Sequence, residues 1–534
     1  MSEQQDSAKR VARRGLLKGA AISAAGAAAT MIGGNASADS PETALGGTCV
    51  CPLPGVPETW DFEADVVVVG YGTGGSAAAI TACDADASVI VLEKMERGGQ
   101  SCEWSGGIIY GSNSSIQQKE GIEDSSDLMF DYYTAVGGGL SNPEVIRVLA
   151  DRSGDTIDWL ADLGVPFFMV AKTGQEDRMD EVTPAVPRGH FTQGMGRGVW
   201  KAVQEAVESR DIEIMLNTKA LELVAGADKT VLGVKAERDG ETIYVRAKKG
   251  VVMTTGSYSW NQKLISTFLP RYRGSWSQMP PGLDGDGLVM CQRLGVDLAG
   301  VGIPVASTPG IQSAELASPY GDVFGWACQV APIGGAPFIM VNKNGVRFTN
   351  ERHNYLFIVD DLLDQPERVS YAIFDENGRL HENVPGLTYV QPGWEAEMEA
   401  GLLKQADTIG ELAEIIGVDP EALEATIEEW NAAAEAGEVP EFGERDFVEP
   451  IVQPPFYAAE VRTTISDPIC GVVINAHAQV MDVDGNVIPR LYAAGSLTGG
   501  WIGEMYPGSG SFLCNAFNFG RVAAENVVSE EPWG

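Results

Sequence analysis

The most constraining feature of this chain is a strand, a glycine-rich turn, a helix and a second strand within about thirty residues. Residues 65–69 form a run rich in valine, typical of a parallel strand buried on both faces. The turn Gly70-Tyr71-Gly72-Thr73-Gly74-Gly75 follows, then an Ala-rich stretch that favours a helix over 76–87. A second apolar run, 89–92, ends at Glu93. Such glycines let a pyrophosphate approach the backbone, and the acid can bond an adenosine ribose, so we predict a dinucleotide-binding α/β domain.

The N-terminus has the composition of a secretory signal. Basic residues at 9, 10, 13 and 14 precede an Ala-rich stretch over 19–34, and Ala36-Ser37-Ala38 forms a cleavage site. Residues 13–18 resemble the twin-arginine signal R-R-x-L-L-K, which implies export of a protein folded around its cofactor and a location outside the cytoplasm. A general secretory signal and a membrane anchor are the alternatives. We expect a signal peptide over 1–38 and a linker over 39–60.

Composition excludes several classes of protein. A chain of 534 residues with 44% hydrophobic residues can bury a large core and divide into more than one domain. The net charge of −37 is spread without a basic stripe after the signal, which argues against nucleic-acid binding. The eight cysteines include no C-x-x-C or C-x-x-C-H, so we expect no attached c-type haem and no metal site. The histidines His190 and His477 have no metal-binding spacing and are interpreted as structural.

The segment after Glu93 resembles a known flavoprotein family. Glu93-Lys94, residues 98–101 and Ser105-Gly106-Gly107 resemble the E-K-x-G-G-N-S/T and S/A-G-G pattern of fumarate-reductase-type flavoproteins, with Gln100 in place of the usual Asn. Residues 251–256, 285–287, 491–495 and 519–521 also match, so the resemblance covers about 60–530. It implies a Rossmann-like FAD-binding domain. The residues it implies for FAD binding are Gly70, Gly72, Thr73, Gly74, Gly75, Glu93, Lys94, Gly99, Gln100, Ser101, Ser105, Gly106, Gly107, Ala220, Thr255, Gly256, Asp286, Gly495, Ser496, Ser511, Phe512 and Leu513.

The domain organisation follows from the same resemblance and a change in composition. We expect the first part of the FAD domain over 61–310, an inserted α+β substrate-capping domain over 311–460, and the return of the FAD domain over 461–534. A charged helical stretch lies in the cap, where Asp419-Pro420-Glu421 has the pattern of a helix start. Substrate is expected between cap and flavin.

The C-terminal motif indicates which chemistry the flavin performs. At the His and Arg with which fumarate reductases hold a dicarboxylate, this chain has Ile502 and Tyr506. Instead, Tyr506-Pro507-Gly508-Ser509-Gly510 is similar to the Y-P-G-x-G of 3-ketosteroid 1-dehydrogenases. That similarity implies that the Tyr506 hydroxyl and the Gly510 amide bind a ketone oxygen, as in an oxyanion hole. The alternative is an ordinary Pro-Gly turn.

A second catalytic candidate lies in the expected cap. Residues 345–351 resemble the G-x-R-F-x-N-E of the superfamily, and Tyr355 stands where ketosteroid dehydrogenases place a catalytic Tyr. We expect Tyr355 to donate or accept a proton, with Arg352 and His353 as neighbours; the alternative is aromatic packing. No tyrosine lies between Tyr133 and Tyr244, where that family has another catalytic Tyr. The chain departs here from the 3-ketosteroid 1-dehydrogenases, so an enone reductase or a dehydrogenase of a different bond remains open.

These features predict an exported FAD-dependent oxidoreductase that reduces or forms a C=C bond conjugated to a carbonyl. A steroid-like or other apolar enone is the expected substrate, which would place the protein in steroid metabolism. A separate membrane cytochrome or quinone system is the expected electron partner. Two alternatives remain: a reductase of an unsaturated carboxylate that uses Arg352 or another arginine of the cap, and a flavin electron-transfer protein without substrate turnover.

Overall fold

The computed structural model describes residues 55–302, 308–312, 327–329, 338–351, 355–381, 394–437, 442 and 449–533. The expected signal peptide and most of the expected linker lie outside these residues, as do Arg352 and His353. The described residues all belong to one unit of the chain, and none of its described helices is long and apolar enough to cross a membrane.

The valine run is the centre of a parallel sheet. Strand β1 (Phe62–Val69) lies between β2 (Val89–Leu92) and β9 (Glu241–Met253) and is parallel to both. The order β19-β20-β9-β1-β2-β6 is completed by β6 (Glu213–Met215), β20 (Val487–Ala493) and the antiparallel edge strand β19 (Gln479–Met481). Residues 66–69 are buried, as predicted for a strand covered on both faces. The predicted α/β fold class with a Rossmann-like domain is confirmed.

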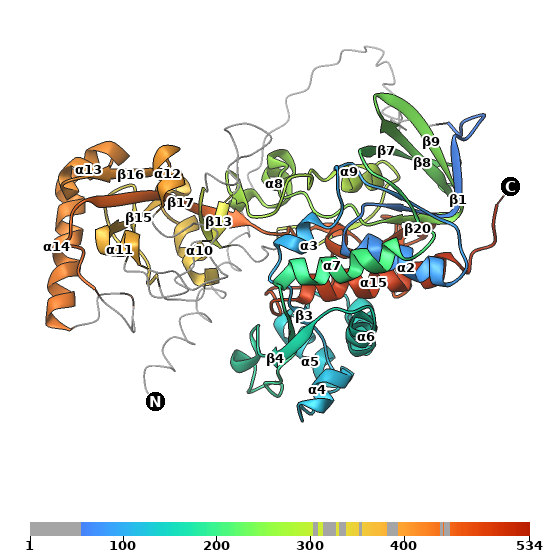
Figure 1. Ribbon diagram of the computed structural model, residues 1–534, viewed down its shortest axis with the longest axis horizontal. Helices are drawn as coiled ribbons and strands as arrows, with labels where there is room; N and C mark the ends of the chain where they lie inside the picture. Colours follow the sequence, from blue (N-terminus) through green and yellow to red (C-terminus); the bar gives the residue numbers. More distant parts are fainter. Residues whose placement is uncertain are drawn as a thin grey trace, which may run out of the picture. The chain divides into compact units, whose positions relative to one another are not determined.

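Two helices pack on this sheet next to the glycine turn, and a third packs beside them (Figure 1). Helix α2 (Thr73–Asp84) begins inside the turn and packs against α7 (Met195–Glu208) and α15 (Ser511–Val527). A Cβ at Gly520 would lie 2.4 Å from the Gly74 carbonyl oxygen, so glycine there lets α15 approach α2 closely. The C-terminal helix thereby returns to the β1–α2 unit.

Further elements complete this part of the molecule. Strand β8 (Val231–Arg238) pairs antiparallel with β9, and β7 (Thr218–Ala225) pairs antiparallel with β8. Short elements connect the strands: α3 (Gln100–Trp104), α8 (Gln262–Phe268), η2 (Pro270–Tyr272), α9 (Asp286–Gln292), β11 (Leu298–Ala299), β18 (Gly471–Val472) and η4 (Gly495–Leu497).

A small antiparallel sheet lies within the first part of the expected FAD domain, where the sequence suggested no separate unit. Its order is β3-β5-β4, from β3 (Ile109–Tyr110), β5 (Gly189–Thr192) and β4 (Phe167–Ala171). The accompanying helices are α4 (Ser115–Lys119), α5 (Ser126–Val136), α6 (Pro143–Asp162) and η1 (Glu176–Arg178). Ser114 and Asn142 cap α4 and α6 through their side chains.

The second large sheet is antiparallel except for one short pair. Its order is β13-β12-β17-β15-β14, from β13 (Ala327–Gln329), β12 (Pro309–Gln312), β17 (Phe456–Ile465), β15 (Ser370–Asp375) and β14 (Ile339–Asn342). Strands β10 (Trp276–Ser277) and β16 (Leu403–Ala406) also pair with β17. The helices are α10 (Tyr355–Leu363), η3 (Pro366–Arg368), α11 (Glu376–Leu380), α12 (Glu395–Glu399), α13 (Ile409–Ile416) and α14 (Pro420–Ala436). Asp419 caps α14 through a 3.1 Å bond from the Glu421 amide, as predicted.

The second sheet extends beyond the boundaries expected for the cap. Strand β10 precedes the expected boundary at residue 310, and β17 continues past residue 460 to Ile465. The physical reason is that β17 is one unbroken ten-residue strand that pairs along most of its length. Its C-terminal end carries the chain to Ser466 and Asp467, which line the cavity described next.

Candidate functional site

The glycines of the first turn have two different roles. A Cβ at Gly75 would lie 1.9 Å from the Gly70 carbonyl oxygen, so Gly75 is required for packing of the turn itself. A Cβ at Gly72 would meet no protein atom within 4 Å, and Gly72 lines a large cavity. Gly72 therefore leaves room for a ligand, whereas Gly75 leaves room for the neighbouring backbone.

Glu93 is held at the end of β2 by two backbone amides. Tyr71 donates its N–H to Oε2 at 2.8 Å, and Met95 donates its N–H to Oε1 at 2.9 Å. Burial raises the pKa of this carboxyl, and the two amides and Lys94 lower it in part. A carboxylate has about four acceptor positions, so Glu93 keeps capacity for a ligand hydroxyl.

A charged cluster flanks Glu93. Lys94 Nζ lies 2.9 Å from Asp284 and 3.0 Å from Asp286, and Lys219 lies 3.3 Å from Asp286. Burial raises the pKa of Asp286, but Lys94 and Lys219 more than offset this and hold it below its usual value. Asp286 is therefore an anion fixed at the cavity wall, where it can accept hydrogen bonds.

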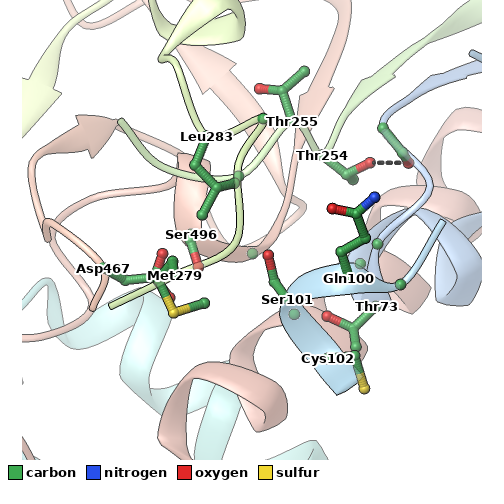
Figure 2. Close-up of a pocket in the computed structure, with 18 of the residues that line it drawn as sticks. Thr73, Gln100, Ser101, Cys102, Thr254, Thr255, Met279, Leu283, Asp467 and Ser496 are labelled. Atoms are coloured by element: carbon green, nitrogen blue, oxygen red, sulfur yellow. Dashed lines mark hydrogen bonds between the residues drawn. The ribbon is translucent and has the colours of Figure 1, made fainter. Parts of the chain in front are cut away.

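The second glycine loop forms another wall. Gly99 and Gly107 have positive φ values of 71° and 63°. A Cβ at Gly99 would lie 2.0 Å from the Trp200 ring, and one at Gly107 would lie 2.2 Å from the Met195 carbonyl carbon. These positions require glycine, and the close packing turns Gln100 and Ser101 toward the cavity (Figure 2).

The cavity has a volume of about 490 Å³ and collects nearly all of the expected cofactor residues. In Figure 2, Thr73, Gln100 and Ser101 lie on one side of it, and Ser496, Leu283 and Met279 on the other. The expected residues that line it are Gly70, Gly72, Thr73, Gly74, Glu93, Lys94, Gly99, Gln100, Ser101, Ser105, Gly106, Gly107, Ala220, Thr255, Gly256, Asp286, Gly495, Ser496, Phe512 and Leu513.

Two expected cofactor residues do not line the cavity. Gly75 is used in packing, as described above. Ser511 is fully buried, and its hydroxyl oxygen lies 2.9 Å from the Tyr133 hydroxyl, which donates to it. Ser511 therefore connects α15 to α5.

The cavity fits FAD. The N-terminus of α2 opens into it at Gly72, where a side chain would occupy ligand space, and a helix N-terminus suits a pyrophosphate. Thr255 Oγ1 is buried there without a hydrogen-bond partner in the described part of the chain. Residues from Val69 to Ala516 contribute to the walls, so an elongated cofactor would contact segments that are far apart in the sequence.

The loop after Trp501 brings Tyr506 and Gly510 to the same cavity. Gly510 adopts φ 101° and caps α15, and its N–H meets no acceptor among the residues that the structure describes. The Tyr506 ring packs 5.8 Å from the Phe512 ring. One loop thus brings Tyr506 and Gly510 to the cavity wall.

A second loop fixes this one from behind. Ser509 donates its N–H to the Thr173 carbonyl at 3.0 Å, and the Thr173 hydroxyl donates to the Ser509 carbonyl at 3.0 Å. Gly174 pairs with Gly508. Tyr132 donates its hydroxyl hydrogen to the Pro507 carbonyl. These contacts hold the backbone of residues 507–509.

Behind residues 173–176 lies a buried polar cluster that sequence reasoning missed. Glu176 is 1% exposed and accepts bonds from the Tyr110 hydroxyl at 3.0 Å and the Gly174 amide at 2.7 Å. Nearby, Arg188 and Asp124 form a fully buried pair at 2.7 Å. No periodicity or motif marks these residues, because they come from separate segments.

The remaining candidates lie as follows. Tyr355 is the first residue of α10, and its side chain lies outside the described part of the chain. His190 is fully buried: its Nδ1 lies 2.9 Å from the Arg188 carbonyl oxygen and its Nε2 lies 2.7 Å from the Ser114 hydroxyl. His477 lies in a turn before β19. The described residues contain no cluster of three or more side chains that could hold a metal.

Comparison with known proteins identifies the family. The family model described as FAD binding domain matches residues 65–513. A digoxin reductase of Eggerthella lenta is 30% identical, with 98% of this chain and 97% of that protein covered.

Two solved structures are similar. A flavocytochrome c3 fumarate reductase has a TM-score of 0.72 and 26% identity over 88% of this chain and 78% of that one. A 3-ketosteroid-Δ4-(5α)-dehydrogenase of Rhodococcus jostii RHA1, with 4-androstene-3,17-dione, has a TM-score of 0.65 and 29% identity over 89% and 98%. The predicted cofactor, FAD, and the prediction of an oxidoreductase acting on CH–CH bonds are confirmed. The chain therefore belongs to the FAD-binding flavoproteins of the fumarate reductase and succinate dehydrogenase superfamily.

Proposed function

We propose that this protein reduces, or in reverse forms, a C=C bond conjugated to a ketone on an apolar, steroid-like substrate. The observation that carries the proposal is that Tyr506 and Gly510 lie on one loop at the wall of the FAD cavity. FAD, when bound, supplies hydride exchange with the substrate.

The chain's own residues supply the remaining chemistry. Tyr506 and Gly510 donate hydrogen bonds to the ketone oxygen, where negative charge develops as the β-carbon is reduced. Tyr355 donates a proton to the α-carbon in the reductive direction and accepts it in the oxidative one. Met279, Leu283 and Phe512 give the cavity an apolar wall that excludes water.

The fixed backbone behind the loop supports this assignment. Donors aimed at a developing oxyanion act best when they do not have to reorganise during the reaction. The bonds of Thr173 and Tyr132 to residues 507–509 hold the loop in one conformation. The similarity to a 3-ketosteroid dehydrogenase also favours a ketone-bearing apolar substrate over a dicarboxylate.

Location and electron partner belong to the same proposal. Residues 1–38 support export by the twin-arginine route to a site outside the cytoplasm. A separate membrane cytochrome or quinone system would then exchange electrons with FAD. The chain has no C-x-x-C-H for a haem of its own, and a similar fumarate reductase is a flavocytochrome.

Anaerobic reoxidation of the reduced holoprotein tests the proposed reaction. The flavin is photoreduced, and its absorbance is followed after adding steroid enones, other enones and unsaturated acids. Rapid reoxidation by an enone, about a hundredfold slower in Tyr506→Phe, supports the proposal. Reoxidation by unsaturated acids alone, unchanged in Tyr506→Phe, would overturn it in favour of a carboxylate reductase. A protein that only transfers electrons would show no reoxidation by any of these substrates, and the wild-type protein and Tyr506→Phe would behave alike.

A further inference from the structure

A buried carboxylate lies in the cavity on the side opposite the second glycine loop. Asp467 follows β17, lines the same cavity as Tyr506 and Gly510, and is 8% exposed. Figure 2 shows it beside Met279 and near Ser496, across the pocket from Gln100 and Ser101. None of the chemistry proposed above uses this residue.

Asp467 has no cationic partner among the described residues. The basic side chains that line the cavity are Lys94, Arg97 and Lys219. Lys94 and Lys219 pair with other aspartates, as described above, and Arg97 pairs with Glu103. The described cations of the cavity are therefore occupied elsewhere.

The surroundings of Asp467 are polar but neutral. Burial raises its pKa, and the neighbouring hydroxyls of Ser257 and Ser496 lower it in part. Ser466 beside it donates to Gln278 Oε1 at 2.9 Å, so that acceptor is already used. A buried carboxyl in such a place gains most from a ligand group that donates a hydrogen bond to it.

A ligand carboxylate at the same place would be disfavoured. Two like charges within a few ångströms repel strongly where water is excluded, and no described cation is available to offset them. A hydroxyl, an N–H group or a cation would instead replace the water that the carboxyl loses on binding. Asp467 thus distinguishes substrates that carry a hydrogen-bond donor at this place from substrates that carry a carboxylate there. Tyr506 and Gly510, which bind the ketone, do not make this distinction.

We propose that Asp467 selects the substrate class: it accepts a hydrogen bond from a hydroxyl or N–H group on the enone substrate and rejects substrates with a carboxylate there. The inference rests on the proposed function, in which the loop of Tyr506 and Gly510 holds the ketone. Asp467 then binds a second, donor-bearing part of the same molecule.

The test uses ligand binding to the oxidised holoprotein. The probes are 4-en-3-one steroids and benzalacetones, each carrying a hydroxyl, its methyl ether or a carboxylate at the end distant from the enone. Dissociation constants come from perturbation of the flavin absorbance without any electron donor. In the wild-type protein we expect the hydroxyl form of at least one skeleton to bind about tenfold more tightly than its methyl ether, with the carboxylate weakest.

The variant Asp467→Asn removes the charge at nearly constant volume. We expect carboxylate binding to improve about tenfold and the preference for the hydroxyl over the carboxylate to shrink correspondingly. Glu460→Gln is the matched control, because it removes one negative charge from β17, the strand that precedes Asp467, where Glu460 pairs with Arg462. On each skeleton, its three dissociation constants should equal those of the wild-type protein.

Each outcome separates this inference from the proposed function. Suppose that enones reoxidise the flavin and that Tyr506→Phe slows this reaction, but that Asp467→Asn leaves the affinities for the hydroxyl, ether and carboxylate forms of each skeleton in their wild-type ratio. The inference about Asp467 is then wrong, while the proposed function stands. If only unsaturated acids react, the proposed function fails with it. Should Asp467→Asn lose FAD, the wild-type comparison decides: equal affinity for hydroxyl and ether on both skeletons overturns the inference.

Discussion

At the scale of single residues, two glycines of the first turn predict opposite effects of the same substitution. Gly75→Ala places a Cβ 1.9 Å from the Gly70 carbonyl oxygen, so the apoprotein should lose about 1–3 kcal/mol of stability. Gly72→Ala meets no protein atom within 4 Å, so the apoprotein should stay as stable while FAD affinity falls at least about tenfold. Thermal unfolding of the apoproteins and FAD titration measure the two effects. Equal loss of stability in both variants would contradict the assignment.

His190 predicts a pH dependence of stability. Burial lowers its pKa to about 4, whereas an unfolded histidine titrates near 6.5. Between these values the unfolded state binds the additional proton, so stability falls as the pH falls from about 6.5 to about 4. The expected loss from pH 7 to pH 5 is about 2 kcal/mol.

His190→Gln isolates this effect. The buried carboxyls of Glu93 and Asp467, whose pKa values are raised, act in the opposite direction but are present in both proteins. The difference between wild type and variant in urea unfolding at pH 7 and pH 5 therefore reports on His190. A variant with the same loss on acidification as the wild type would show that His190 is not held neutral.

At the scale of elements, helix α5 positions the loop that carries Tyr506. Tyr132 donates to the Pro507 carbonyl and accepts the Gln175 amide at 2.8 Å, so it joins both loops. Tyr132→Phe removes both bonds while keeping the ring. We expect flavin reoxidation by an enone to slow about tenfold with FAD affinity unchanged, because the donors lose their fixed direction.

A control lies on the same helix. Thr134 is exposed and its hydroxyl donates only within α5, to the Phe130 carbonyl, so Thr134→Val should leave the rate unchanged. If Tyr132→Phe loses FAD in parallel with its rate, the role of Tyr132 is in folding of the cavity rather than in positioning the loop.

The same elements show what could be predicted from sequence. Strand β1, the glycine turn and α2 follow from a local pattern within 65–93, because burial and turn geometry there depend on neighbouring residues. The capping of α14 by Asp419 follows in the same way. Tyr132 and Pro507, in contrast, are 375 residues apart and meet only in the folded chain. Glu176 and Asp467 carry no motif, so their burial became apparent only from the packing around them.

At the scale of the whole molecule, FAD is expected to stabilise the β1–α2 unit and helix α15 together. The cavity takes residues from the β1–α2 turn near the start and from α15 near the end, and these helices pack on each other. A ligand that binds only the folded state adds RT ln(1 + [L]/Kd), about 2.7 kcal/mol at a concentration of one hundred times Kd. Removing FAD should therefore lower the unfolding temperature of the β1–α15 core as one cooperative unit.

Hydrogen exchange with and without FAD checks this expectation. Amides of β1 and α15 should lose protection together in the apoprotein, because each wall of the cavity loses the same ligand. In Gly72→Ala, restoring the protection of β1 and α15 should need a higher concentration of FAD. The protection of these amides in the apoprotein should be unaltered, since the substitution acts only on ligand binding. Protection lost from α15 alone would show that the C-terminal segment docks on the sheet independently of the cofactor.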